Sequence, residues 1–520
     1  MGLRISTDRD RYVRWAILGV LILNACWIFL PTCFVSLDGW AHLQSARILI
    51  DGPDGSLFCP NPSIVPNQTA YWVLGVLQAI LPALLAERVL IALILLLLGG
   101  GTWMLARAYG QGNPLVLLVL PFTFNFMLLL GFHNFLLGLG LALVFAAQWI
   151  RARRLTWIAL GLFVLASFLL FYTHPMVVAV FYLLCGGHEA AVHLGIFERE
   201  RPGLLGKPFV AIAAFAMVCA PAVVAIVLFN SAQHSSPGAV DRVFNLRELI
   251  DLRSLVLFDK EGEMKFLYAL KLILFVAALI VGFERYRSRL SGRRILQPGD
   301  VLLFASIVVF AGYFTMPDSA GFASYITVRL QLIGLLLFVA WLAVRPVPLA
   351  QLFAPVLMVL LVHNARSGYI RERMDVIAPK LELVQEAAEH IPVGATVLPV
   401  STEPHWLLSH LPSMLGAVRD INVMCDYECS LSYFPLVWCE STPAPMLAHF
   451  DGSSICLDWL EAHTTSGAAP AIDHIVLLGF PSDSISCAKD NLEAVLAQHY
   501  RQTFSNAYAK IFERSEGTER

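Results

Sequence analysis

Residues 88–107 read RVLIALILLLLGGGTWMLAR, and the only charges in this run stand at its two ends. A helix needs about 20 mostly apolar residues to cross the hydrocarbon core of a bilayer. The rest of the chain has a similar character, since 58% of its 520 residues are hydrophobic and 14% are charged. Most of the chain therefore cannot form a water-soluble globule, and we predict an all-α polytopic membrane domain.

Apolar stretches of this kind recur through the first 365 residues and predict about eleven spans. They cover residues 13–31, 88–107, 114–130, 135–150, 156–172, 175–194, 207–229, 266–283, 299–316, 330–344 and 349–363. Residues 70–85 are one more apolar stretch, but a span there would upset the alternation of basic loops. We therefore interpret it as an interfacial helix.

Basic residues fall on alternate loops, and the positive-inside rule places those loops in the cytoplasm. They are Arg4, Arg9, Arg11, Arg14, Arg107, Arg151, Arg153, Arg154, Arg199, Arg201, Lys207, Arg285, Arg287, Arg289, Arg293, Arg294 and Arg345. The opposite loops, beginning with the first outer loop at 32–87, then share the outer side with the tail. Such inner loops fit a bacterial plasma membrane or an endoplasmic reticulum, and we expect the former.

The tail, residues 366–520, has ordinary polarity and is predicted to be a small extracytoplasmic α/β domain that follows the membrane domain at 1–365. A helix is expected over 378–391, and short β-strands are expected at Thr396–Pro399 and Ile475–Gly479. The net charge of −2, without a long Lys/Arg block, excludes nucleic acid as a partner. The chain also lacks a Gly-rich nucleotide-binding loop.

The ten cysteines are divided among spans, the first outer loop and the tail. Cys33 and Cys59 flank the first outer loop, and a bridge between them would tie the loop at both ends. Cys425 and Cys429 have a metal-like spacing without a second close pair or a histidine partner. We expect disulfides or burial rather than metal at Cys425, Cys429, Cys439, Cys456 and Cys487, and leave a divalent cation open as the only cofactor.

The first outer loop begins SLDGWAHLQSAR at residues 36–47, directly after the first span. Asp38 and His42 stand four residues apart, on one face of a helix at the membrane surface. A carboxylate there suits a general base that takes the proton of a sugar hydroxyl, and an imidazole suits the same task. The alternative is an ordinary helix N-cap by Asp38 with His42 facing water.

Further features follow this loop in the sequence. They are a Pro- and aromatic-rich segment at 60–72, Glu87-Arg88 at the opening of the second span, and Gly131-Phe132-His133-Asn134-Phe135 and His174-Pro175 at outer helix ends. Together with Asp38 and His42 they resemble the GT-C superfamily of membrane glycosyltransferases, which use polyprenyl-phosphate-linked sugar donors. The resemblance covers the first 365 residues in topology and roughly 30–110 in detail.

This resemblance implies that an acidic residue of the first outer loop is the catalytic base, which corresponds to Asp38. The loop has no Asp-Asp or Asp-Glu pair, so the assignment of the base rests on one residue. The resemblance also implies a polyprenyl-phosphate sugar donor, a glycan, lipid or protein acceptor, and a phosphate-binding arginine near Arg329.

Arg329 follows Tyr325 in the sequence and is a candidate for bidentate hydrogen bonds to the donor phosphate. Its alternatives are an interfacial arginine that reaches toward water and a salt bridge with Asp318. Arg88, beside Glu87, is likewise a candidate for phosphate binding, with an interfacial or salt-bridged arginine as the alternative.

His133, Asn134 and His174 stand at outer helix ends and are further candidates for substrate binding. Polar groups at membrane depth are costly unless they pair or bind something. The alternative for them is a hydrogen bond between helices. In the tail, Asp426-Tyr427-Glu428 and Ser432-Tyr433-Phe434-Pro435 suit stacking on a sugar, but we favour packing against the membrane domain.

The function that these features favour is transfer of a hexose or pentose from a lipid phosphate to an acceptor at the outer face. A multi-span transporter or flippase of lipid-linked sugars is the alternative, since polar residues within spans also describe carriers. Against it, the sequence has no two-fold repeat. A polysaccharide polymerase or ligase and a non-catalytic scaffold are further alternatives.

Overall fold

The computed structural model describes residues 2–52, 57–110, 112–152, 156–196, 208–231, 238–291, 296–320, 323–439, 457, 459–467, 470–479 and 489–515. Several residues used in the sequence analysis lie outside these ranges. They are Cys456, Cys487, Arg153, Arg154, Arg199, Arg201, Lys207, Arg293 and Arg294.

The chain forms two compact units, each assembled from separate parts of the sequence. The bundle unit contains residues 1–30 and 91–371, and the loop–tail unit contains residues 31–90 and 372–520. The predicted division at residue 365 assigned the first outer loop to the membrane domain. The compact units instead group this loop with the tail.

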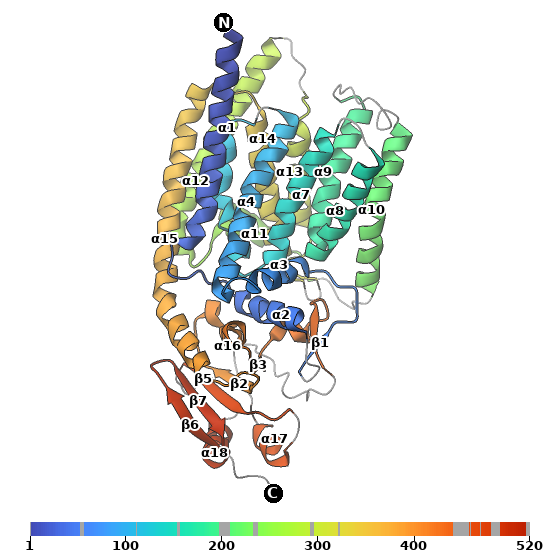
Figure 1. Cartoon of the computed structure of the whole chain (residues 1–520). Helices are drawn as coiled ribbons and strands as arrows, with labels where there is room; N and C mark the ends of the chain where they lie inside the picture. Colours follow the sequence, from blue (N-terminus) through green and yellow to red (C-terminus); the bar gives the residue numbers. More distant parts are fainter. Residues whose placement is uncertain are drawn as a thin grey trace. The chain divides into compact units, whose positions relative to one another are not determined.

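The bundle unit is helical, and its long helices run side by side (Figure 1). Its elements are α1 (Gly2–Cys26), η1 (Trp27–Phe29), α4 (Ala83–Tyr109), η2 (Pro114–Val119), α5 (Leu120–Thr123), α6 (Phe126–Leu129), α7 (His133–Arg151), α8 (Trp157–Thr173), α9 (Pro175–His193), α10 (Pro208–Ser231), α11 (Arg242–Ile250), η4 (Arg253–Leu255), α12 (Lys260–Leu290), α13 (Asp300–Thr315), α14 (Ile326–Val344) and α15 (Leu349–Glu389). Residues 83–90 of α4 and residues 372–389 of α15 belong to the loop–tail unit.

Within the described part of the chain, eight helices are long and apolar enough to cross a membrane. Three shorter apolar helical stretches, Pro114–Leu129, Trp157–Thr173 and Asp300–Thr315, accompany them. Each predicted span coincides with one of these helices or stretches. The chain is therefore an integral membrane protein.

The predicted span 114–130 is not one continuous helix, and this part of the prediction is wrong. The Asn113 side chain accepts a hydrogen bond from the Leu115 N–H at 2.7 Å and starts η2. Phe124 is extended, and the Asn125 side chain accepts from the Leu128 N–H at 3.0 Å to start α6. These asparagine caps offer the backbone an alternative to a continuous helix, which apolar composition does not reveal.

The apolar stretch 70–85 does not form a span, as predicted. Its helix α3 (Thr69–Gln78) has 10 residues, too few to cross a bilayer. Its buried face contains Tyr71 and Leu74, whereas the apolar side chains of Trp72 and Val76 are exposed. An exposed apolar face on a short helix suits contact with the membrane interface.

The loop–tail unit combines helices with a mixed sheet and confirms the predicted α/β character. Its elements are α2 (Gly39–Asp51), β1 (Phe58–Pro60), α3, β2 (Thr396–Ser401), η5 (Trp406–Leu408), α16 (Ser413–Val418), β3 (Asn422–Val423), η6 (Tyr427–Ser430), β4 (Leu436–Trp438), α17 (Leu460–Ser466), β5 (His474–Leu478), α18 (Lys489–His499), β6 (Tyr500–Ser505) and β7 (Ala509–Arg514). Both predicted strands are present as β2 and β5, and the predicted helix 378–391 is the end of α15.

The sheet has the strand order β3-β2-β5-β7-β6. Strand β2 pairs in parallel with β3 on one side and with β5 on the other, while β7 pairs antiparallel with β5 and β6. After β2 the chain therefore forms β3 on one side of it, and later forms β5 on its other side. In sheets of this kind, ligand sites form at the carboxyl ends of the parallel strands where the winding reverses.

A disulfide joins the first outer loop to the tail. Cys59 is bonded to Cys439 across a sequence separation of 380, beside the antiparallel pair β1–β4. The suggested bridge between Cys33 and Cys59 is therefore wrong, and Cys33 is a buried free thiol. Cys425 and Cys429 are also buried free thiols. The described residues include no group of three or more His, Cys, Asp or Glu side chains that could hold a metal ion.

Candidate functional site

Helix α2 begins directly after Asp38, at a point where only glycine fits. A β-carbon added to Gly39 would lie 3.0 Å from Glu87 Cδ and closer still to Glu87 Oε1 and Ser36 Oγ. Ser36 donates a hydrogen bond to Glu87 at 2.9 Å, so the start of α2 is tied to the start of α4. This close approach fixes the backbone next to Asp38.

Asp38 is buried, with 5% of its surface exposed. It occupies the N-cap position of α2, but its side chain makes no capping hydrogen bond, so the capping alternative is wrong. Its carboxylate instead accepts a hydrogen bond from the Tyr427 hydroxyl. His410 Nε2 lies 3.9 Å from Asp38 Oδ1, and the His410 ring packs edge-on against the Tyr427 ring at 4.2 Å.

His42 is buried as well, which contradicts the alternative in which it faces water. Its Nε2 lies 2.9 Å from Glu428 Oε1. The Tyr71 hydroxyl donates to the other oxygen of Glu428 at 2.6 Å, and the Tyr71 ring contacts the His42 ring edge-on at 5.0 Å. An imidazole held by a carboxylate in this way resembles the base and orienting acid of many active sites.

The tail motif Asp426-Tyr427-Glu428 thus packs against the first outer loop. Asp426 accepts a hydrogen bond from Ser45 of α2 at 2.6 Å and another from the Glu428 N–H at 3.1 Å, which starts η6. Phe434 packs edge-on against Tyr71 at 6.3 Å. The acids of this motif follow β3 at its carboxyl end, whereas Asp38 and His42 stand at the start of α2, which packs against α16.

Burial changes the proton affinity of these groups. Removal from water raises the pKa of Asp38 to about 7, an effect that the neighbouring His42 partly opposes. Burial also raises the pKa of Asp426 to about 7 and of Glu428 to about 8, and lowers the pKa of His42. A carboxyl group that titrates near neutrality can exchange a proton with a substrate, as a general base must.

The side chains of Glu87 and Arg88 contact different parts of the first outer loop, although the two residues are adjacent in the sequence. Glu87 is buried and bound to Ser36, whereas Arg88 donates a hydrogen bond to the Thr32 carbonyl. Arg88 therefore holds the backbone of the first outer loop.

A second polar group lies in the bundle unit. His174 caps α9, since its Nδ1 accepts from the Met176 N–H at 3.2 Å, and its Nε2 lies 2.9 Å from Arg329 Nη1. The Arg329 guanidinium lies over the rings of Phe132 and Phe135, at 4.6 and 5.5 Å from their centroids. Arg329 is only 7% exposed, so it is buried in the bundle and does not reach toward water.

Aromatic rings connect Arg329 to a second arginine. Tyr325 contacts Phe132 at 6.1 Å and Phe126 at 5.7 Å, and Arg253 lies over the Phe126 ring at 3.7 Å. The backbone of Tyr325 has a φ of 57°, which side-chain-bearing residues rarely adopt. Strain of this kind is often found at ligand sites.

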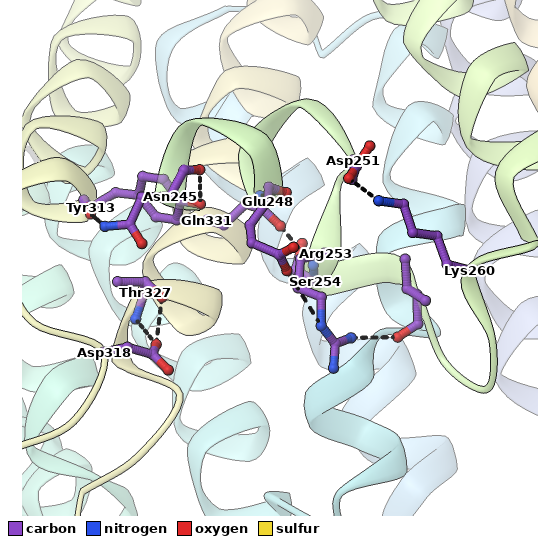
Figure 2. Close-up of polar contacts among 11 residues, drawn as sticks. Asn245, Glu248, Asp251, Arg253, Ser254, Lys260, Tyr313, Asp318, Thr327 and Gln331 are labelled. Carbon is purple, nitrogen blue, oxygen red and sulfur yellow. Dashed lines mark hydrogen bonds and ion pairs between the residues drawn. The ribbon is translucent and has the colours of Figure 1, made fainter. Parts of the chain in front are cut away.

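The backbone of the segment that contains Arg253 is anchored to α14 by hydrogen bonds with the Gln331 side chain (Figure 2). Gln331 accepts from the Ser254 N–H at 2.6 Å and donates to the Glu248 carbonyl at 2.9 Å. Arg253 itself lies 3.6 Å from the Glu248 carboxylate and donates to the Val256 carbonyl at 2.9 Å. The sequence analysis missed Arg253, because nothing local links it to Phe126.

His133 and Asn134 start α7 and are both buried. They directly precede Phe135, which contacts the His174 ring at 5.5 Å. The predicted residues His174, Tyr325 and Arg329 thus form one group with Arg253 in the bundle unit. Asp38 and His42 form another group in the loop–tail unit, with His410, Tyr427 and Glu428, of which the sequence analysis missed His410.

No protein-family model and no curated protein sequence matches the chain. Among solved structures, it is similar to ArnT from Cupriavidus metallidurans bound to undecaprenyl phosphate, with a TM-score of 0.56 and 12% identity over 97% of this chain and 98% of the other. ArnT in the apo state also matches, with a TM-score of 0.49 and 11% identity over 98% of each chain. The undecaprenyl-phosphate-bound structure shows that the chain has the fold of ArnT. The predicted fold class is therefore confirmed.

Proposed function

We propose that the chain transfers a hexose or pentose from a polyprenyl-phosphate donor to an acceptor hydroxyl at the outer face of the membrane. The observation that carries this proposal is Asp38, a buried carboxyl group with a pKa of about 7 at the start of the first outer loop. The fold of a protein crystallised with undecaprenyl phosphate supports the lipid-linked donor.

In this reaction Asp38 acts as the general base. It takes the proton of the acceptor hydroxyl while the hydroxyl oxygen bonds to the anomeric carbon of the sugar. The bond between that carbon and the phosphate oxygen breaks at the same time, and the electron pair leaves with the lipid phosphate. The acceptor is a glycan, a lipid or a protein.

Arg329 and Arg253 are proposed to bind the phosphate of the donor. A buried guanidinium forms two parallel hydrogen bonds to a phosphate and offsets its charge as it leaves. The aromatic rings beneath both arginines hold their planes in place. His133, Asn134, His174 and Tyr325 are proposed to contribute to donor binding beside Arg329, and Arg88 to support the first outer loop.

The disulfide Cys59–Cys439 supports an outer location for the loop–tail unit. Disulfides persist in oxidising compartments such as the bacterial periplasm and are rare in the cytosol. Together with the basic residues of the alternate loops, this favours a C-terminal domain outside the cytoplasm, and we propose the bacterial plasma membrane as its location.

The test is transfer of radiolabelled sugar from a panel of undecaprenyl-phosphate pentoses and hexoses by the purified chain in proteoliposomes. We expect transfer by the wild-type chain and none by Asp38→Asn, which keeps the shape of the side chain but removes the base. Asp51→Asn, at the exposed end of the same helix, is the matched control and should transfer normally. Equal transfer by wild type and Asp38→Asn would refute the assignment of the base.

The phosphate site is tested separately by binding of undecaprenyl phosphate itself. We expect Arg329→Gln and Arg253→Gln each to weaken binding by about 10- to 100-fold, the usual cost of losing a charge-assisted hydrogen bond. Undiminished binding by both variants would refute this part of the proposal. Movement of labelled lipid across the bilayer without sugar transfer would instead favour a flippase.

A further inference from the structure

The loop–tail unit contains one feature that the proposed reaction leaves unexplained. A residue of the tail, Tyr427, bonds directly to the proposed base, although the two are separated by almost 390 positions in the sequence. Its hydroxyl donates to the Asp38 carboxylate and remains protonated, since burial and that carboxylate raise the pKa of Tyr427 well above its ordinary value. A neutral donor is thus fixed on the base.

Tyr427 is itself held through the residue before it and through its own ring. Asp426, the residue before it, is bound to Ser45 at 2.6 Å and to the Glu428 N–H at 3.1 Å. The His410 ring packs against the phenol ring at 4.2 Å. These contacts leave the phenol little freedom to turn away, so its hydroxyl defines where one oxygen of Asp38 points.

The other charged and titratable neighbours of Asp38 do not fix the direction of its carboxylate as the Tyr427 hydroxyl does. His42 and Glu428 form a pair with each other, and Glu87 and Asp426 lie beside His42. His410 is close to Asp38, but burial lowers the pKa of His410 to about 4, so its ring is neutral at neutral pH. Glu428 and Asp426 oppose ionisation of Asp38, whereas His42 and the Tyr427 hydroxyl favour it.

We propose that Tyr427 is a positioning residue for Asp38, whose hydroxyl holds one carboxylate oxygen and leaves the other for the proton of the acceptor. The proposal rests on the proposed function, in which Asp38 is the base. A hydrogen bond to the ionised form of a carboxyl group favours that form. Tyr427 therefore sets both the direction of the base and the pH at which it becomes active.

The test compares the pH dependence of kcat/KM in wild type and Tyr427→Phe, a change that removes one oxygen. We expect the acid limb of the profile to move up by about one pH unit, because the ionised carboxylate loses a donor. Tyr508→Phe is the matched control, since Tyr508 donates to the Glu403 carboxylate at 2.8 Å in the same unit. Its acid limb should stay at the wild-type position.

A second variant covers the case in which Tyr427→Phe does not fold. Replacement of Tyr427 by 3-fluorotyrosine retains the ring and makes the hydroxyl a stronger donor, so the acid limb should move to lower pH. An unchanged limb in either variant, or a rate that falls equally at every pH, would overturn the proposal while Asp38→Asn still abolished transfer. Full transfer by Asp38→Asn would overturn the proposed function instead, and the two failures are distinguishable.

Discussion

Gly39→Ala is expected to impair transfer more than it impairs folding. Gly39 is the first residue of α2 and follows the proposed base directly in the chain. Its α-carbon faces Glu87, whose carboxylate accepts the hydrogen bond of Ser36. A methyl group at this position therefore presses on the contact that joins the start of α2 to the start of α4.

The expected loss of transfer follows from the distance between the added β-carbon and its neighbours. The added carbon would lie 3.0 Å from Glu87 Cδ and closer still to Glu87 Oε1 and Ser36 Oγ, whereas ordinary contact begins at 3.4 Å, so these groups or the helix must move by well over 0.4 Å. Overpacking of this kind costs about 1–3 kcal/mol of stability. A 1 Å misplacement of a reacting group costs about 100-fold in rate, so we expect a loss of transfer between about 3- and 100-fold.

The assay is sugar transfer by equal amounts of folded protein, with the thermal midpoint measured on the same samples. Gly368→Ala is the matched control, because Gly368 lies in the middle of α15 with nothing within 4 Å of the added carbon. It should transfer at the wild-type rate. Wild-type transfer by Gly39→Ala at an unchanged thermal midpoint would refute the close packing on which the position of Asp38 depends.

Three other predictions concern pH, the disulfide and the buried ion pair of the bundle. The transfer rate should rise as the pH passes through about 7, because Asp38 is a base only after it loses its proton; a limb at the ordinary pKa of an aspartic acid would contradict the raised pKa of Asp38. Reduction of Cys59–Cys439 should lower the free energy of unfolding of the wild type by about 2–5 kcal/mol, seen as a lower thermal midpoint. A Cys59→Ser/Cys439→Ser variant should not respond to reductant, and equal responses of both chains would contradict this. Arg366→Leu should destabilise the bundle by about 3–5 kcal/mol in detergent unfolding, because it leaves the buried carboxylate of Glu263 without its cation and three buried backbone carbonyls without their donor; an unchanged unfolding midpoint would contradict this.

The sequence predicted the helical membrane domain and the position of nearly every span. Apolar runs of about 20 residues have few alternatives to a membrane helix, because lipid offers the backbone no hydrogen-bond partners. The prediction failed locally at 114–130, where Asn113 and Asn125 cap short helices. A side-chain cap depends on one hydrogen bond, and an average over hydropathy does not detect it.

The sequence also pointed to Asp38, His42, His174, Tyr325 and Arg329 as candidates by residue type and position, and their roles stay predictions. It did not identify their partners. Arg253 lies over Phe126 and the tail residue Tyr427 bonds to Asp38, although each pair is separated by more than a hundred positions. No local pattern encodes such contacts.

Pairing of the first outer loop with the tail was likewise decided by tertiary structure alone. Cysteine spacing suggested Cys33 as the partner of Cys59, but strand pairing between β1 and β4 places Cys439 there instead. What the sequence by itself determined is the solvent of each segment, because burial in lipid depends on composition summed along a helix. Only the fold decided which distant side chains form hydrogen bonds with one another. Such bonds require distances of about 3 Å, here between residues that come from the two ends of the chain.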